Sequence, residues 1–220
     1  MGSLFRNHNE ERQAEAPHAA KRALRFKWIP IRKLAPQHRP RILAHLLALD
    51  ERDRYLRFGY AASDAQIERY AAQLDFERDE VFGVFNRRLA LVAIAHLAYF
   101  DPASSPACAE FGVSVAKGSR GRGYGERLFD HAALHARNRR IDALLVHALS
   151  ENAAMLRIAR NAGARIVRDG PQSDAWVKLA PENLASRVEE LVEDRVADLD
   201  YRLKLQAHRA EALLPGRGKA

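Results

Sequence analysis

A glycine-rich run between an expected strand and an expected helix is the segment of this chain best suited to bind phosphate. It reads Arg120-Gly121-Arg122-Gly123-Tyr124-Gly125. Glycines allow several backbone N–H groups to point at one spot, and the positive end of the following helix adds to their attraction for a diphosphate. The guanidinium groups of Arg120 and Arg122 supply fixed positive charge beside them.

Two other phosphate-binding loops do not fit these residues. A P-loop ends in Gly-Lys-Ser or Gly-Lys-Thr, which this run lacks. A dinucleotide fingerprint needs a third glycine, which is missing whether the pattern starts at Gly121 or at Gly123. That fingerprint also normally falls near the start of a βαβ unit, not past the middle of a chain. A structural turn without a ligand remains the alternative.

Alternating and helical patterns place this loop within one mixed α/β or α+β domain. Strands are expected at residues 25–34, 81–86, 89–100, 109–115, 141–149, 164–168 and 175–179. Helices are expected from Pro36 onward and over residues 63–74, 124–138 and 152–162. Residues 50–59 are expected to form a loop.

Residues 181–214 differ from the rest, since they predict one long amphipathic helix. Its apolar residues recur at helical spacing: Leu184, Val188, Leu191, Val192, Val196, Leu199 and Leu203. Its first part is acidic and its end is basic, which complements the helix dipole. Because length alone does not stabilise such a helix, it packs either on its own domain or against a second copy of the chain.

Composition sets the outer limits of the domain and of the function. Residues 1–22 are polar and are expected to form a flexible arm before a domain at 23–180, and residues 215–220 form a tail. The chain has 220 residues, 47% of them hydrophobic, and a net charge of +8. This favours a packed protein that attracts anions. Its basic residues lack the interleaved aromatic residues of single-strand binders, so nucleic acid is not an expected partner.

Membrane, secreted, disulfide-linked and zinc-binding proteins are disfavoured, because the sequence lacks their characteristic features. No run of about 18 apolar residues predicts a membrane span, and the N-terminus has no apolar signal core. Cys108 is the single cysteine, which predicts no disulfide framework and no zinc cluster and suits a cytoplasmic location. No metal site is expected.

The spacing of Arg120, Gly123 and Gly125 matches Arg/Gln-x-x-Gly-x-Gly/Ala, and on this motif the chain resembles the GNAT N-acetyltransferase superfamily. Three further segments are similar to the acetyltransferase domain of bacterial Pat-type protein lysine acetyltransferases: Tyr55-Leu56-Arg57-Phe58, residues 109–115 and residues 151–159. The resemblance extends from about Arg25 to Leu179. It implies a mixed, mostly antiparallel central sheet flanked by helices, with acetyl-CoA as cosubstrate.

The resemblance also implies roles for individual residues. Backbone groups of Val113 and Val115 would pair with the pantetheine arm as if it were an added strand, and Ser114 would orient the thiol. Asn152 would bind the pantetheine or a nearby loop. The pyrophosphate would be held by Arg120, Gly121, Arg122, Gly123, Tyr124 and Gly125.

Glu110 is the candidate general base, because a lysine amine with a pKa near about 10.4 must lose a proton before it attacks. The alternative is an ordinary surface carboxylate. A backbone N–H near Val113 would meet the oxyanion. His96 and His147 lie in apolar strands and are expected to be core histidines with satisfied hydrogen bonds.

One position departs from the family pattern. Many members carry a tyrosine acid four residues before a Gly-Phe pair, whereas this chain has Ala159 there and Ala164 after Gly163. Water can take over this role, because a thiol with a pKa of about 8.5 is a fair leaving group.

The favoured function is therefore transfer of an acetyl group from acetyl-CoA to a primary amine by direct attack. The amine is left open between a protein lysine and a small molecule. The alternative is a non-catalytic acyl-CoA-binding sensor or scaffold.

Overall fold

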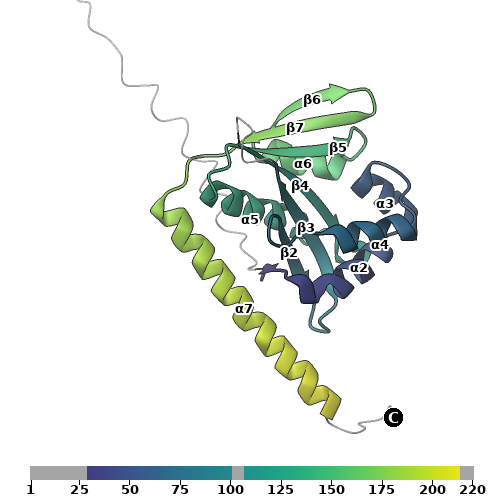
Figure 1. Ribbon diagram of the computed structural model, residues 1–220, viewed down its shortest axis with the longest axis vertical. Coiled ribbons are helices and arrows are strands. Elements are labelled where there is room, and N and C mark those ends of the chain that lie inside the picture. The colour runs from purple at the N-terminus through teal and green to yellow at the C-terminus, as the bar shows by residue number, and fades with distance from the viewer. Residues whose placement is uncertain (1–28, 101–106, 214–220) are drawn as a thin grey trace, which may run out of the picture.

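Seven strands form one sheet at the centre of the molecule (Figure 1). The computed structural model describes residues 29–100 and 107–213. The sheet has the order β1-β2-β3-β4-β5-β7-β6. In chain order the strands are β1 (Arg32–Lys33), β2 (Glu80–Phe85), β3 (Leu91–Tyr99), β4 (Cys108–Val115), β5 (Ala143–Leu149), β6 (Arg165–Asp169) and β7 (Gln172–Lys178). In the described part of the chain, every neighbouring pair is antiparallel except β4 and β5. The predicted mixed, mostly antiparallel sheet is confirmed.

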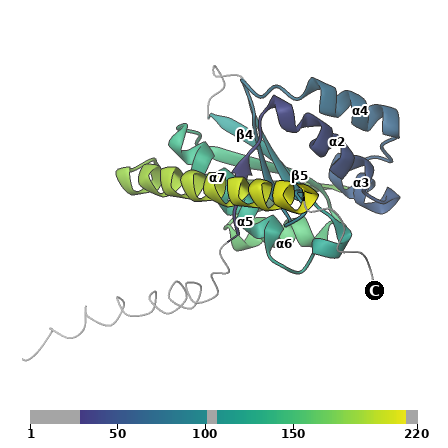
Figure 2. The same cartoon turned by 90° about the horizontal axis from the view of Figure 1, so that it is seen from below.

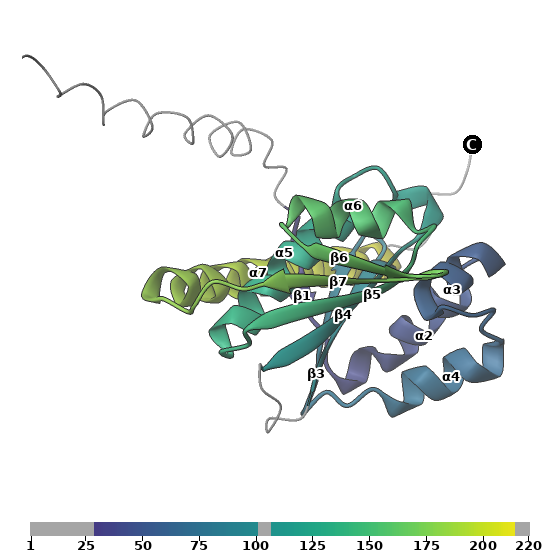
Figure 3. The ribbon, with the colours of Figure 1, turned by 90° about the horizontal axis from the view of Figure 1, so that it is seen from above.

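Helices cover both faces of this sheet (Figure 3). One face carries α2 (Arg39–Leu47), α3 (Glu51–Phe58) and α4 (Asp64–Gln73), preceded by the short 3₁₀ turn η2 (Pro36–His38). The other carries α5 (Tyr124–Asn138), which follows the 3₁₀ turn η3 (Lys117–Ser119), and α6 (Ala153–Asn161). Two apolar clusters result, because β2 and β3 are buried on both faces and pack against α2 on one side and α5 on the other.

Local sequence signals explain where several helices begin. The Ser63 hydroxyl accepts from the N–H of Gln66, and the Gln66 side chain accepts from the N–H of Ser63, a reciprocal cap that starts α4. Helix α5 spans 124–138 as the sequence predicts. Asn152 caps α6 by accepting from the N–H of Met155 at 3.1 Å.

The prediction of a loop at 50–59 is wrong, because residues 51–58 form α3. The Asp50 carboxylate caps the helix by accepting from the N–H of Asp53 at 2.9 Å, and Gly59 ends it with a left-handed φ of 80°. The segment is short and highly charged, so it lacks the apolar stripe that identifies a helix from sequence. Its cap and its terminal glycine were the available signals.

The predicted boundaries near the two ends of the chain fall partly outside the described residues. The strand expected at 25–34 is limited in the described residues to Arg32 and Lys33. The arm at 1–22 and the tail at 215–220 lie outside the described residues. Between residues 29 and 100 and between 107 and 213, no helix combines the length and the hydrophobicity needed to cross a membrane.

The predicted C-terminal helix is α7 (Leu184–Leu213), which runs alongside α5 and past β1 (Figures 1 and 2). It packs on its own domain through polar groups. Arg32 bonds Asp198 at 2.8 Å and stacks on the ring of Tyr201, and Lys204 donates to the carbonyl of Phe85. The apolar residues that defined the helix in the sequence point to solvent instead, with Leu184 80% exposed and Leu199 59% exposed.

The buried carboxylate of Glu80 on β2 links the sheet to the C-terminal end of α5. Glu80 is 2% exposed and accepts from the hydroxyl of Tyr99 at 2.7 Å and from Arg139 at 3.0 Å, and it also bonds Lys33. Desolvation by burial opposes its charge, but the neighbouring imidazole of His135 above all, together with Lys33 and Tyr99, outweighs it and holds the pKa of Glu80 far below its usual range. Glu80 is therefore ionised at neutral pH and depends on its partners.

We predict that Tyr99→Phe lowers the free energy of unfolding by about 1–2 kcal/mol, because it removes one hydrogen bond to a buried charge. Chemical denaturation measures the change. Tyr60→Phe is the control, since Tyr60 is 48% exposed, and we expect it to stay within about 0.5 kcal/mol of the parent. Equal stability of all three proteins would contradict the role given to the Tyr99 hydroxyl.

Candidate functional site

The two parallel strands separate part-way along their length. β4 and β5 are in register from Cys108 opposite Ala143 to Glu110 opposite Leu145. Beyond that point β4 continues to Val115 and β5 to Leu149. The opening between them holds a cavity of about 840 Å³, whose walls include α3 and the beginnings of α5 and α6.

The backbone of β4 presents hydrogen-bonding groups to this opening. The carbonyl of Cys108 accepts from Phe100, and the N–H of Ala116 donates to Val92, so the even-numbered residues of β4 pair with β3. Because antiparallel strands alternate in this way, the N–H and C=O groups of Val113 and Val115 point toward the gap. These are the two residues that the sequence assigned to pair with an extended ligand.

At one end of the cavity the glycine-rich run leads into α5. Gly121 and Gly123 have left-handed φ values of 72° and 80°, which side chains with a Cβ disfavour. Gly123 is the N-cap of α5 and provides no side-chain cap. The first N–H groups of a helix have no partner within it, so the start of α5 forms a concentrated positive site.

The two arginines of this run differ in position. Arg120 lines the cavity, donates from Nε to the carbonyl of Val115 at 3.3 Å, and forms an ion pair with Asp53 of α3. Arg122 is exposed and does not line it. Arg120 is thus held in place by contacts within the chain, whereas Arg122 is exposed outside the cavity lining.

Asn152 joins two walls of the cavity. Its side-chain oxygen caps α6, and its Nδ2 donates to the carbonyl of Leu56 in α3 at 3.4 Å. Asn152 lines the cavity. The sequence left open whether Asn152 binds the pantetheine or a nearby loop, and in the structure its side chain contacts a helix, α3.

Glu110 lies where the two strands begin to separate. It is paired with Ala98 on one side and Leu145 on the other, and its side chain is exposed and lines the cavity. Ser114 lies two pairs further along on the same face of β4. Its hydroxyl is buried and bonds Nε2 of His45 at 2.9 Å, so the side chain is engaged by α2 rather than free in the cavity.

Arg57 is a cavity residue that the sequence reasoning did not single out. Its guanidinium lies against Gly112, where a Cβ would stand 2.9 Å from the Arg57 Cζ. It donates to the hydroxyl of Tyr70 at 2.8 Å, Tyr70 bonds Nδ1 of His96 at 2.9 Å, and Nε2 of His96 bonds Asp79 at 2.9 Å. Arg57 lies in the segment Tyr55-Leu56-Arg57-Phe58, whose similarity to Pat-type domains was the available sequence signal.

Burial sets the charge states along this chain of contacts. Desolvation lowers the pKa of His96 and raises the pKa of Tyr70. His96 has its hydrogen bonds satisfied, as predicted. The corresponding prediction for His147 as a core residue is wrong. His147 is exposed at the cavity, where its Nδ1 bonds Asp174 at 2.6 Å.

Ala159, at the position of the usual tyrosine acid, faces the core. Its side chain is fully buried in the cluster between α6 and the sheet, whereas its neighbour Ile158 lines the cavity. Of the predicted site residues, the structure brings Glu110, Val113, Ser114, Val115, Arg120, Gly121, Gly123, Tyr124, Gly125 and Asn152 to one cavity and leaves out Arg122.

A family model described as the acetyltransferase (GNAT) domain matches residues 29–165. This match covers more than half of the chain. The chain belongs to the GNAT acetyltransferase family. A comparison with curated proteins finds no match.

Solved structures of this family share the fold. The GNAT domain of Streptomyces lividans PAT matches with a TM-score of 0.58 and 22% identity, over 68% of this chain and 89% of that one. A GNAT acetyltransferase from Staphylococcus aureus Mu50 matches with a TM-score of 0.55 and 15% identity, over 69% of this chain and 99% of that one. At these identities the likeness concerns the fold alone.

We predict that Gly123→Ala weakens binding of acetyl-CoA about tenfold. An alanine at this left-handed position costs about 1–2 kcal/mol, and relaxation of the loop would misplace the N–H groups at the start of α5. A calorimetric titration measures the change. Gly118→Ala is the matched control, because Gly118 has no neighbour within 4 Å and does not line the cavity. Equal loss in both variants would contradict a specific role for Gly123.

Proposed function

We propose that this GNAT protein transfers an acetyl group from acetyl-CoA to a primary amine, either a protein lysine or a small-molecule amine. The observation that carries the proposal is the continuity of one cavity. It connects the uncapped start of α5, the free backbone edge of β4 and the carboxylate of Glu110. Family membership supports acyl transfer, and this arrangement supports acetyl-CoA as the donor.

The donor would lie along β4. Its pyrophosphate would meet the N–H groups at the start of α5 together with Arg120, and its pantetheine arm would pair with Val113 and Val115. The thioester would then lie near the point where the strands separate. A backbone N–H near Val113 would stabilise the oxyanion that forms when the amine attacks.

Glu110 would take a proton from the attacking amine. A primary ammonium is not a nucleophile, so a carboxylate beside the thioester raises the fraction that reacts at neutral pH. The tetrahedral intermediate would collapse with loss of the CoA thiolate. Water would protonate it, because Ala159 supplies no acid and lies in the core.

We predict that Glu110→Gln leaves the dissociation constant for acetyl-CoA, expected in the micromolar range, unchanged and lowers kcat by about 10²–10⁴-fold at neutral pH. The amide cannot accept a proton but keeps the shape of the side chain. The deficit is expected to shrink as pH approaches the pKa of the amine. Release of free thiol with lysine peptides and small amines measures turnover.

Glu77→Gln serves as the control, because Glu77 is exposed and lies outside the cavity. An unchanged rate in Glu110→Gln would contradict the assignment of the base. Failure of the folded parent protein to bind acetyl-CoA would contradict the proposed function itself.

The buried position of Ala159 supports a second candidate, a non-catalytic sensor or scaffold that binds acyl-CoA. Binding of acetyl-CoA without thiol release on any amine tested would favour it over the enzyme. Either function uses acetyl-CoA, a cytoplasmic metabolite, so the proposal includes a cytoplasmic location.

We further propose that α7 mediates a homodimer. The row of apolar residues that points to solvent includes Leu191, which is 58% exposed, Leu199, 59% exposed, and Leu203, 57% exposed. The full row, with exposed Leu184, Val188, Val192, Val196, Leu199 and Leu203, recurs every three to four residues, which is the spacing of a coiled-coil seam. A second copy of the same helix offers a matching surface.

Leu199→Asp is accordingly expected to convert a dimer into a monomer in light scattering at micromolar concentration, because it places a charge in the apolar row. Val167→Asp on β6 is the control, since Val167 is 48% exposed and β6 lies at the edge of the sheet opposite to β1, which α7 contacts. A monomeric parent protein would contradict the dimer.

A further inference from the structure

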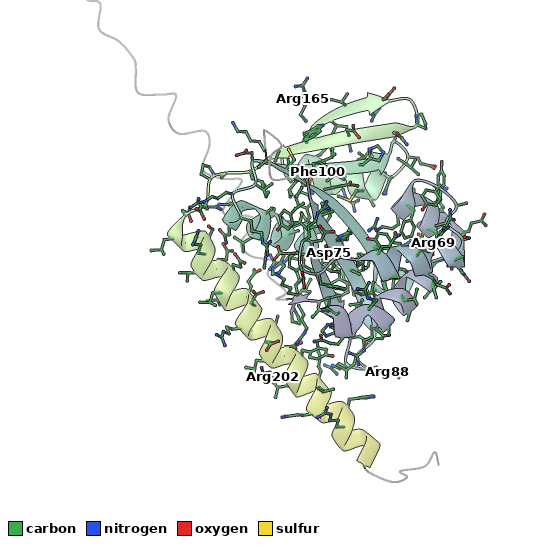
Figure 4. The ribbon with its side chains drawn as sticks, viewed as in Figure 1. Arg69, Asp75, Arg88, Phe100, Arg165 and Arg202 are labelled. Atoms are coloured by element: carbon green, nitrogen blue, oxygen red, sulfur yellow. The ribbon has the colours of Figure 1, made fainter. Side chains whose placement is uncertain are left out.

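Two buried histidines on α5 face three carboxylates on α7. His131 and His135 are one helical turn apart, and each is 2% exposed. Opposite them lie Glu190, Glu193 and Asp194. Figure 4 shows the side chains that fill the space between the N-terminal half of α7 and the body of the molecule. This cluster lies outside the cavity described above.

Each imidazole directs Nδ1 to a carboxylate. The Nδ1 of His131 lies 2.7 Å from Glu193, and because a carboxylate only accepts, this nitrogen is the donor. The Nδ1 of His135 lies 3.2 Å from Glu190 and 3.5 Å from Glu80, at angles too poor for a hydrogen bond. A carboxylate behind Nδ1 is the arrangement that orients histidine ligands of metals and leaves the lone pair on Nε2.

The two Nε2 atoms are buried and have no hydrogen-bond partner. The Nε2 of His135 lies 3.8 Å from an oxygen of Asp194. One ring nitrogen of each histidine and one oxygen of Asp194 all lie within 4.8 Å of one another. A buried nitrogen without a partner costs free energy, and a metal ion bound by both histidines and Asp194 would give these nitrogens a partner.

We propose that this chain binds one Zn²⁺ ion between α5 and α7, through Nε2 of His131, Nε2 of His135 and the carboxylate of Asp194. Imidazole and carboxylate ligands suit this ion. Ligand atoms around tetrahedral zinc are about 3.4 Å apart, so the site closes with shifts of about 1 Å in side chains. Asp194 is 39% exposed, which gives the ion a route from solvent and leaves a fourth position for water.

The sequence-based expectation of no metal rested on the single cysteine, and this site uses none. The ion would give the unpartnered imidazole nitrogens a ligand and would link the two helices by metal bonds. It would therefore hold the N-terminal half of α7 on the domain, which makes the placement of the helix dependent on zinc.

The test uses the full-length protein after treatment with a chelator. Calorimetric titration with ZnCl₂ is expected to show one tight site per chain, and Co²⁺ is expected to give the visible absorption of a four-coordinate ion, which Zn²⁺ removes. Asp194→Asn is expected to lower zinc affinity about 100-fold or more, as loss of a ligand must exceed the loss of an orienting group. Limited proteolysis within α7 is expected to slow on adding Zn²⁺ in the parent protein and not in this variant.

His208→Gln is the matched control, because His208 is an exposed histidine on the same helix and is expected to leave zinc binding unchanged. His135→Gln tests a buried ligand, with circular dichroism to confirm folding. If it does not fold, Asp194→Asn decides the question alone, since that side chain is partly exposed. Equal zinc affinity in the parent and Asp194→Asn proteins, or no tight site in the parent, would overturn the proposal.

Discussion

The separation of β4 from β5 beyond Glu110 is the constraint on which the rest of the site depends. A strand in the middle of a sheet normally satisfies its backbone groups on both sides, and leaving them unpaired is costly. Here the register ends while both strands continue, so the groups of Val113 and Val115 on one side have no strand to bond. An extended ligand can complete the sheet at this place. The same strand then leads through η3 into α5, so the uncapped start of α5 lies at the end of the same gap.

The alternation of β4 divides its side chains between the two faces of the sheet. Odd-numbered residues such as Phe111 point to α5, where Phe111 packs edge-on against Phe129. Even-numbered residues point to the helices on the other face, where Ser114 bonds His45 and Gly112 lies against Arg57. Glu110 belongs to this second set. In the proposed reaction Glu110 would therefore act from this face of the sheet, while the backbone edge of β4 would hold the cofactor. A Cβ at Gly112 would stand 2.9 Å from the Arg57 Cζ, so a side chain there would require the guanidinium to move.

The sequence predicted the elements that depend on local residue patterns. It did not predict the elements and side chains whose positions depend on contacts between distant segments. The strands, the helix at 124–138 and the glycine-rich turn before it followed from periodicity and glycine spacing. Helix α3 did not, because its eight residues are mostly charged and its stabilising groups are the cap at Asp50 and the contacts that it makes across the chain. Asp53 and Arg57 were missed with it, although both line the cavity. His147 was taken for a core residue because its neighbours in β5 are apolar, yet alternation places it on the open side of the strand.

Helix α7 shows why an amphipathic pattern does not by itself say which face is buried. The hydrophobic effect favours burial of the apolar row, yet that row points to solvent and the polar side lies on the domain. The inner face is specified by polar contacts: Arg32 pairs with Asp198, and the imidazole of His131 bonds the Glu193 carboxylate. Such contacts stabilise little when they are exposed. When they are buried, loss of one partner costs free energy, because the other charge is left unpaired. A helix held in this way stays in place only while its inner charges are balanced, and its outer apolar row gains free energy only by meeting another surface. The domain interface and the exposed row therefore place separate requirements on one helix. The inner face requires that its carboxylates stay paired with positive groups, and the outer row would gain free energy from contact with a partner.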